Sequence, residues 1–351
     1  MQTPEPATAE RRLRVLLLHT ARHKASYRYR IAEMLPRLER AGIEFVEVEM
    51  KGHSLWRKLA VALSARHYDY VWIQKRTLSK PLVALLSLDA KLVYEYDDAL
   101  YARETSRTTP PKPSQPGSTR EIARLRFILE KSTVVFAGSD ELAAYAGQYN
   151  DNVHLVPTCP PEVTLENSAK ASPELLEGPV TIGWIGTGLN LFYLRSIDEA
   201  CHAFQREHPE VCFSLMSSEP PEGLTSSWSF EPWSPEAADR WFRSIDVGIM
   251  PLIDDTWSRG KCAFKLLQYM SYGKAVIASA VGSNCEAVEH GVNGYLVSSP
   301  EEWQQALVQS AADHEKRDAM GREGRRIILE RYDLAGVERT ILNALGLQAR
   351  A

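Results

Sequence analysis

The sequence predicts an α/β protein with two successive domains, each built on a mostly parallel sheet. The chain has 351 residues, which is more than one compact core usually needs. Short apolar runs alternate with helical stretches, as is typical of parallel strands joined by right-handed crossovers. The alternation stops in a proline-rich stretch, residues 157–179, and then starts again. We therefore expect a linker there, over residues 161–179.

The N-terminal domain is predicted over residues 13–160, after a polar lead-in, residues 1–12, that we expect to be disordered. A helix is expected over residues 30–41 and is ended by Gly42; Pro36 interrupts the pattern, so the helix either is kinked there or starts later. A second helix is expected around residues 81–88, and the proline-rich residues 103–120 are expected to form a loop. The apolar runs predicted as strands are residues 15–18, 43–50, 70–73, 92–94, 133–137 and 153–156.

The C-terminal domain is predicted over residues 180–335. Its expected strands are residues 180–185, 211–216, 247–250, 275–278 and 294–297. Its expected helices are residues 191–207, 235–243, 264–272 and the stretch from residue 301 onward. Residues 336–351 are expected to form a last helix that packs back on the N-terminal domain. Ligands of such sheets bind beyond the carboxyl ends of the strands, so we expect the site in a cleft between the domains.

Composition argues against several classes of protein. The formal net charge of −4 argues against a nucleic-acid partner, because proteins that bind the phosphate backbone usually carry a basic excess. The five cysteines are odd in number and form no C-x-x-C motif, as is typical of a reducing cytoplasm. No apolar run approaches the ~20 residues that cross a bilayer. We expect a cytoplasmic protein, with any membrane contact peripheral and at the inner membrane surface.

Cations and glycines gather between residues 254 and 294. Arg259, Lys261 and Lys265 precede or open a predicted helix, where free backbone N–H groups and the positive helix end attract anions. Gly282 follows a predicted strand and lets the backbone approach a ligand closely. On these residues alone two interpretations stay open. One is a pocket for a diphosphate, and the other is a solvated loop with capping glycines.

The same stretch resembles the donor-binding signature of retaining family 4 glycosyltransferases of the GT-B fold (glycosyl transferases group 1). The pattern is LLQYMxxGKAVIASxVG over residues 266–282, followed by GxNGYLV over residues 291–297. The resemblance implies two Rossmann-like domains facing across a cleft, with a nucleotide-sugar donor on the C-terminal domain and the acceptor on the N-terminal one. It also implies transfer with retention of configuration, without a metal or other cofactor.

The sequence departs from that family in its charged residues. The family has two glutamates with seven residues between them, and the matching positions here are Gly260 and Gln268. The family's Arg and Lys after the first strand of the C-terminal domain are also absent. We infer that Arg259, Lys261 and Lys265 bind the diphosphate and that Gln268 can hydrogen-bond the ribose. The full expected donor set is Gly186, Thr187, Arg259, Lys261, Lys265, Gln268, Gly282 and Asn284.

Asp97 and Asp98 end a predicted strand of the N-terminal domain, at the edge where ligands of parallel sheets bind. They are candidates to orient the donor sugar or to stabilise positive charge on its ring, and with Lys261 they form the predicted catalytic set. Adjacent aspartates also suit Mg²⁺, which the resemblance disfavours. A helix N-cap at Asp98 is the structural alternative.

The loop after the first strand, residues 19–30, is rich in cations, histidines and tyrosines. It is expected to face an anionic acceptor, such as a phospholipid-linked sugar or an acidic glycan. A solvated basic start of a helix is the alternative. His19 and His23 have no third ligand nearby, so no metal is expected there. The residues assigned to the acceptor are His19, Arg22, Arg28 and Arg30.

These features favour a hexosyltransferase-like glycosyltransferase, of the kind found in polysaccharide biosynthesis, that acts on a glycan, lipid-linked or small-molecule acceptor. Two alternatives remain open. One is a nucleotide-sugar epimerase on the same scaffold, which would turn over the donor without an acceptor. The other is a non-catalytic protein that binds a nucleotide or glycan.

Overall fold

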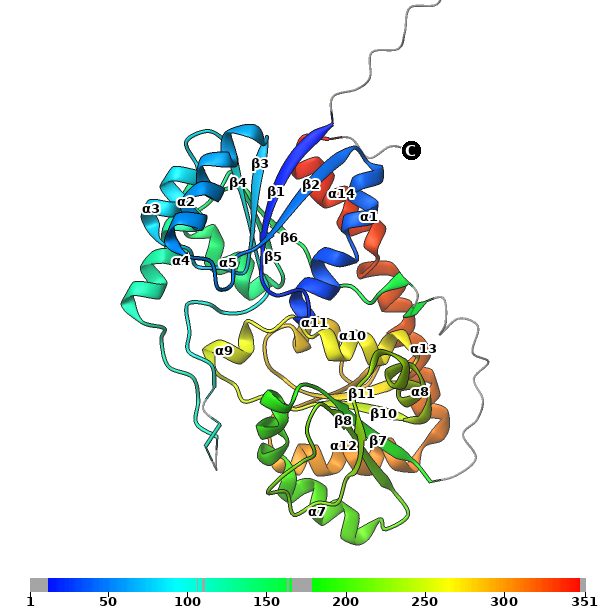
Figure 1. Cartoon of the computed structure of the whole chain (residues 1–351). Helices are drawn as coiled ribbons and strands as arrows, with labels where there is room; N and C mark the ends of the chain where they lie inside the picture. The colour runs from blue at the N-terminus through cyan, green and yellow to red at the C-terminus, as the bar shows by residue number, and fades with distance from the viewer. Residues whose placement is uncertain (1–11, 106, 109–110, 163, 166–178, 348–351) are drawn as a thin grey trace, which may run out of the picture.

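Two six-stranded sheets form the framework of the molecule, one above the other in Figure 1. The computed structural model describes residues 12–105, 107–108, 111–162, 164–165 and 179–347. The strand orders are β2-β1-β3-β4-β5-β6 and β12-β11-β10-β7-β8-β9, and all neighbouring strands run parallel. The predicted α/β fold with two parallel sheets is confirmed.

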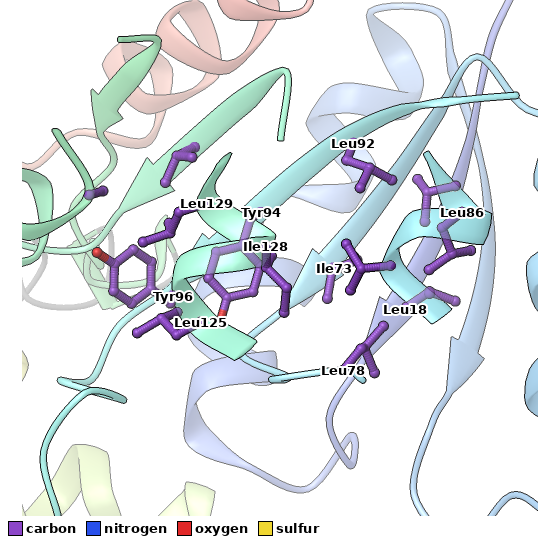
Figure 2. Packing of buried hydrophobic residues seen from close by; sticks show 14 of the residues in the cluster. Leu18, Ile73, Leu78, Leu86, Leu92, Tyr94, Tyr96, Leu125, Ile128 and Leu129 are labelled. Carbon is purple, nitrogen blue, oxygen red and sulfur yellow. The ribbon is translucent and has the colours of Figure 1, made fainter. Parts of the chain in front are cut away.

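The N-terminal sheet has helices on both faces. Its strands are β1 (Leu13–His19), β2 (Ile43–Glu49), β3 (Tyr70–Gln74), β4 (Lys91–Tyr96), β5 (Val134–Ala137) and β6 (Val153–Leu155). Its helical segments are η1 (Tyr27–Ala32), α1 (Leu35–Arg40), α2 (Leu55–Ser64), η2 (Ala65–His67), α3 (Lys80–Leu86), α4 (Thr119–Lys131) and α5 (Asp140–Gly147). Figure 2 shows the core beneath α3 and α4, where Ile73, Tyr94 and Ile128 pack in one buried cluster.

The C-terminal sheet is built in the same way. Its strands are β7 (Thr181–Ile185), β8 (Cys212–Ser217), β9 (Ser229–Pro232), β10 (Val247–Met250), β11 (Ala275–Ser279) and β12 (Gly294–Val297). The helical segments are η3 (Gly188–Ser196), α7 (Asp198–Glu207), α8 (Pro235–Ser244), α9 (Thr256–Arg259), α10 (Phe264–Ser271), α11 (Asn284–Ala287), α12 (Pro300–Ala312) and α13 (His314–Arg331). Two buried clusters, one on each face, join these helices to the sheet.

The last helix, α14 (Leu334–Ala344), returns to the N-terminal sheet and lies beside α1 (Figure 1). Its apolar residues Val337 and Ile341 are buried with Val15 and Leu17 of β1. The Tyr70 hydroxyl donates a hydrogen bond to the carbonyl of Leu345, at 3.2 Å. The chain therefore passes from the N-terminal sheet to the C-terminal sheet and back. The returning helix α14 completes the core of the N-terminal domain.

Several expected elements differ in detail. Of the two alternatives for Pro36, the later helix start is confirmed, because Pro36 lies in the first turn of α1, where its missing N–H costs nothing. The expected helix over residues 191–207 is divided into η3 and α7. The elements α2, α4 and β9 were not predicted. Residues 1–11 of the expected lead-in and 166–178 of the expected linker lie outside the described residues.

The strand order places one topological switch point in each sheet. The order reverses between β1 and β3 in the N-terminal sheet, and between β7 and β10 in the C-terminal sheet. Open α/β sheets bind ligands beyond the carboxyl ends of the strands at such points. Lys75 follows β3, and Gly186 follows β7, so both residues lie at these positions. Among the described residues, no helix is both long enough and apolar enough to span a bilayer.

Candidate active site between the two sheets

Small residues allow the two domains to approach closely. A Cβ atom added at Gly260 would lie 2.7 Å from the Cβ of Ala99 and 3.0 Å from its backbone nitrogen, across the domain boundary. A Cβ added at Gly138 would lie 2.6 Å from the Cys262 sulfur and 3.2 Å from the Cα of Asp97. The shortest distance at each position, 2.7 and 2.6 Å, is too short for a side chain unless something shifts. A glutamate at position 260 would therefore force the domains apart.

Asp97 and Asp98 face Lys75, which the sequence did not single out. The Lys75 Nζ is 2.8 Å from an oxygen of Asp97 and also pairs with Asp98. Burial opposes the charge on Lys75, but the two carboxylates outweigh it and raise the pKa of the ammonium. Burial likewise acts to raise the pKa of Asp97, but Lys75 and Arg30 outweigh it and lower that pKa below its usual value. Both partners are therefore held in their charged forms.

Lys75 has a strained backbone. Its φ is +51°, and the other described non-glycine residue with positive φ is Ala263, at +48°. Ala263 is the N-cap of α10, directly after Lys261 and Cys262. Such conformations cost on the order of 1–3 kcal/mol and tend to cluster at functional sites. The two strained residues lie on opposite sides of the domain boundary, with Lys75 after β3 and Ala263 at the start of α10.

Lys261 lies at the domain boundary, and Lys265 lies at the carboxyl end of β7. The Lys261 Nζ is 4.0 Å from Asp98 and lies over the ring of Trp257, 5.3 Å from its centroid. The Lys265 Nζ lies 4.4 Å from the centroid of the Trp184 ring, and 3.1 Å from where a Cβ at Gly186 would be. In the part of the chain that the structure describes, no carboxylate pairs with Lys265. Burial first, and Lys261 second, lower its pKa to about 7.

The remaining donor candidates lie in different surroundings. Arg259 is half exposed and makes two hydrogen bonds to Asp254, of 2.6 and 3.0 Å, so a neighbouring carboxylate balances its charge. Arg259 was expected to bind the diphosphate, and the sequence did not indicate this pairing with Asp254. Asn284 is buried and donates to the carbonyl of Ser279, 2.9 Å away, which fixes the end of β11. Gly282 has a φ of +51° and packs against the Arg259 backbone, while Thr187 is the N-cap of η3 beside Gly186.

Gln268 contacts the N-terminal domain. Its side chain hydrogen-bonds the hydroxyl of Tyr29, whose ring lies 4.5 Å from that of Phe264. Arg28 also crosses the boundary, with its guanidinium 4.7 Å from the centroid of Trp233, beyond β9. The loop that was expected to face only an acceptor thus lies against the donor-side domain at these residues.

The other acceptor candidates are less exposed than expected. Arg30 is buried, forms an ion pair with Glu95 and donates to the Thr158 hydroxyl at 2.9 Å. Its charge is therefore balanced inside the N-terminal domain, and we revise its assignment from an acceptor contact to a structural ion pair. His19 is also buried, with its Nε2 3.6 Å from Glu47. Arg22 is exposed and pairs with the same glutamate at 3.1 Å.

A segment of the N-terminal domain reaches across to Asp255, which the sequence also did not single out. The buried Asp255 carboxylate accepts hydrogen bonds of 2.7 Å from the Thr105 hydroxyl, the Ser114 N–H and the Ser258 N–H. Thr105 also contacts the hydroxyl of Tyr193, at 3.2 Å. One capping carboxylate at the start of α9 therefore ties the two domains together. Sequence patterns identify such a cap but not its distant partners.

The described residues include no group of three or more His, Cys, Asp or Glu side chains that could hold a metal ion. Asp97 and Asp98 have Lys75 between them, so Mg²⁺ would have to displace an ammonium group to bind there. The geometry instead places Lys261 and Lys265, two neighbouring lysines, opposite a carboxylate–ammonium cluster across the domain boundary.

The sequence was compared with family models and with curated proteins. Residues 192–313 match the family model described as glycosyl transferases group 1. The match begins in η3 and ends after α12, so it covers α10 and the lysines before it. Among curated proteins there is no significant match. The family match and the fold together support a glycosyltransferase of the GT-B fold.

Solved structures with this fold cover almost the whole chain. Anabaena HepE in complex with UDP and glucose is 16% identical, with a TM-score of 0.67 over 95% of this chain and 99% of that one. Sucrose-phosphate synthase from Thermosynechococcus elongatus is 14% identical, with a TM-score of 0.70 over 95% and 98%. The UDP-forming α,α-trehalose-phosphate synthase from Burkholderia vietnamiensis is 10% identical, with a TM-score of 0.65 over 95% and 99%. At these identities the similarity establishes the shared GT-B fold.

Proposed function

We propose that the protein transfers a hexose from a nucleotide-diphosphate sugar to an acceptor held by the N-terminal domain. UDP-sugars are the first donors to test, because the HepE structure contains UDP. The diphosphate would lie at Gly186, between Lys261 and Lys265, and Gln268 would reach the ribose. Asn284 and Gly282 would shape the turn behind it, with Thr187 beside the phosphates.

The observation that carries this proposal is the position of Lys265 beside Gly186, at the switch point of the C-terminal sheet, with Lys261 close enough to lower its pKa. A buried ammonium without a carboxylate partner is costly unless an anion neutralises it. A diphosphate supplies that anion. A side chain at Gly186 would collide with the Trp184 ring, so the glycine lets that ring and the Lys265 ammonium lie against the end of β7.

The proposed chemistry follows from these charges. As the bond between the anomeric carbon and the diphosphate breaks, negative charge develops on the leaving oxygen, where Lys261 and Lys265 stabilise it. The sugar ring becomes positive, and Asp98 on the facing domain stabilises that charge. The acceptor hydroxyl oxygen bonds to the same face of the sugar and its proton passes to the departing diphosphate oxygen, so configuration is retained, as the resemblance to family 4 implies. Lys75 pairs with both aspartates and holds them in place.

We infer that this reaction needs no metal, because lysines neutralise the leaving group. The test is an activity assay with UDP-sugars and a panel of acceptors, with and without a chelator, in which NMR gives the anomeric configuration of the product. We expect turnover in chelator and a product with the donor's configuration. Loss of turnover in chelator would refute the metal-free mechanism. Donor conversion without any acceptor would favour the epimerase.

A further inference from the structure

A cavity of about 480 Å³ lies in the N-terminal domain, apart from the donor residues. It is bounded by the start of α2, the segment between β3 and α3, and one side of α4. Leu78, part of the buried cluster in Figure 2, forms one wall. Because β3 ends at its edge, the cavity adjoins the switch point of the N-terminal sheet.

The lining of this cavity is cationic. Four of the lining residues are cations, and none is a carboxylate: Lys58, Lys75, Arg76 and Arg124. Lys75 is neutralised by Asp97 and Asp98. Among the described residues, no ion pair within 4.0 Å is formed by Lys58, Arg76 or Arg124; the nearby Glu121 caps α4 through Ser118. The hydroxyls of Thr77 and Ser79 complete a lining that suits a phosphate group.

Helix α2, which borders the cavity, exposes large apolar side chains that form what we call the apolar rim. Helix α2 leaves Leu55 70%, Trp56 81% and Leu63 60% exposed, and its one fully buried residue is Ala62. Leu55 and Leu59 also line the cavity. A helix that presents large apolar side chains to solvent beside cations is typical of a surface that meets lipid chains. A purely polar acceptor would leave this apolar rim without a role.

We propose that the cavity binds the acceptor, and that this acceptor is a phosphorylated lipid carrying the sugar or hydroxyl to be modified. The phosphate lies between Arg76, Arg124 and Lys58, and the apolar chain runs out over Leu55 and Trp56. The reacting end points toward Lys75 and Asp98, since Lys75 belongs to both the cavity and the aspartate cluster. This inference rests on the proposed function, and it moves the acceptor from the first loop to α2 and α4.

Calorimetry on the full chain with three probes tests this proposal: farnesyl phosphate, farnesol and glycerol 3-phosphate. Farnesyl phosphate should bind at least about tenfold more tightly than either of the others, because it alone supplies both chemistries. The double variant Arg76→Gln/Arg124→Gln should weaken its binding about tenfold, and Trp56→Ser should weaken it severalfold. Matched controls are Arg126→Gln, an exposed arginine of α4 paired with Glu130, and Leu329→Ser, an exposed leucine of α13.

Each alternative occupant gives a distinct result. Equal binding of glycerol 3-phosphate and farnesyl phosphate, with no effect of Trp56→Ser, would contradict a lipid-linked acceptor. Equal effects of Arg76→Gln/Arg124→Gln and Arg126→Gln would contradict the phosphate site. A change from dimer to monomer in Trp56→Ser, measured by ultracentrifugation, would show that α2 contacts a second copy and would overturn the proposal.

No binding of farnesyl phosphate to a protein that binds UDP would refute this inference alone, whereas failure to bind any nucleotide would refute the proposed function.

Discussion

Gly260 shows how one residue determines the distance between the domains. The family pattern places a glutamate at this position, and its absence from the sequence could be taken as loss of function. The structure gives a steric reason instead, because Ala99 of the facing domain occupies the space where a side chain would be. Asp98 is the neighbour of Ala99, so the same contact positions a candidate catalytic carboxylate.

We predict that Gly260→Ala lowers turnover strongly and destabilises the protein by about 1–3 kcal/mol, the range for overpacking. Combining Gly260→Ala with Ala99→Gly should restore part of the turnover and part of the stability, since one of the two clashing methyl groups is removed. Chemical denaturation and an activity assay measure the two effects. Gly147→Ala, where the added methyl meets nothing within 4 Å, is the control and should be neutral. If Gly260→Ala changes neither turnover nor stability, close approach of the domains at Gly260 is not needed for activity.

Lys265 links the charge of the site to pH. Its folded-state pKa of about 7 is below the ordinary value of 10.5, so the folded protein binds fewer protons than the unfolded chain between these two values. The stability cost is therefore fully present below pH 7 and disappears as pH rises toward 10.5. Lys265→Met should remove that cost and raise the Tm at pH 6 by about 2 °C or more.

Donor binding should show the opposite dependence on pH. A bound diphosphate favours the protonated lysine, which is already half populated at pH 7 but scarce at pH 8.5. We predict that the affinity for UDP falls about tenfold over this interval, and that calorimetry detects proton uptake. In Lys265→Met the affinity should be weak and independent of pH across the same range. A wild-type affinity that does not change between pH 7 and 8.5 would remove Lys265 from the diphosphate site.

At the scale of elements, most strands could be predicted because strands buried on both faces are continuous apolar runs, such as residues 70–73. The elements that were not predicted, such as α2 and β9, lack a continuous buried apolar run. Helix α2 buries little and exposes Leu55 and Trp56, so its pattern does not show a core-facing stripe. Strand β9 is a short, exposed edge strand. Of the site, Asp97, Asp98 and Lys261 could be found by their places after strands or before a helix. Lys75 also follows a strand, so the same rule offers it as a candidate, but only the fold shows that it pairs with the two aspartates.

The segment around Thr105 and Ser114 is predicted to depend on Asp255 for its attachment to the C-terminal domain. Asp255→Asn keeps the shape but offers one acceptor oxygen in place of two, so it should free this segment at a cost of about 1–2 kcal/mol. Trypsin cleavage after the exposed Arg107 should then accelerate about tenfold. Asp254→Asn, which alters an exposed carboxylate next to it, is the control. Equal cleavage rates in both variants would show that Asp255 does not hold the segment.

At the scale of the whole molecule, function depends on two sheets that meet through their strand ends. The C-terminal domain supplies the lysines, the N-terminal domain supplies the aspartates and the cationic cavity, and α14 returns the chain to the N-terminal sheet. The charged residues of the two domains have different proposed roles. Cationic side chains proposed to bind anions lie in both domains, and a carboxylate–ammonium cluster lies between them.

The central claim is that the C-terminal half binds a nucleoside diphosphate through Lys261 and Lys265, and calorimetric titration with UDP tests it most directly. We predict that Lys261→Ala weakens the binding of UDP about tenfold or more in the presence of chelator, as expected for the loss of a charge-assisted contact. Lys274→Ala should leave it unchanged, because Lys274 donates to the Arg243 carbonyl at the end of α8, away from the site. Equal losses in the two variants, or no binding of UDP or GDP by the wild-type protein, would contradict the account.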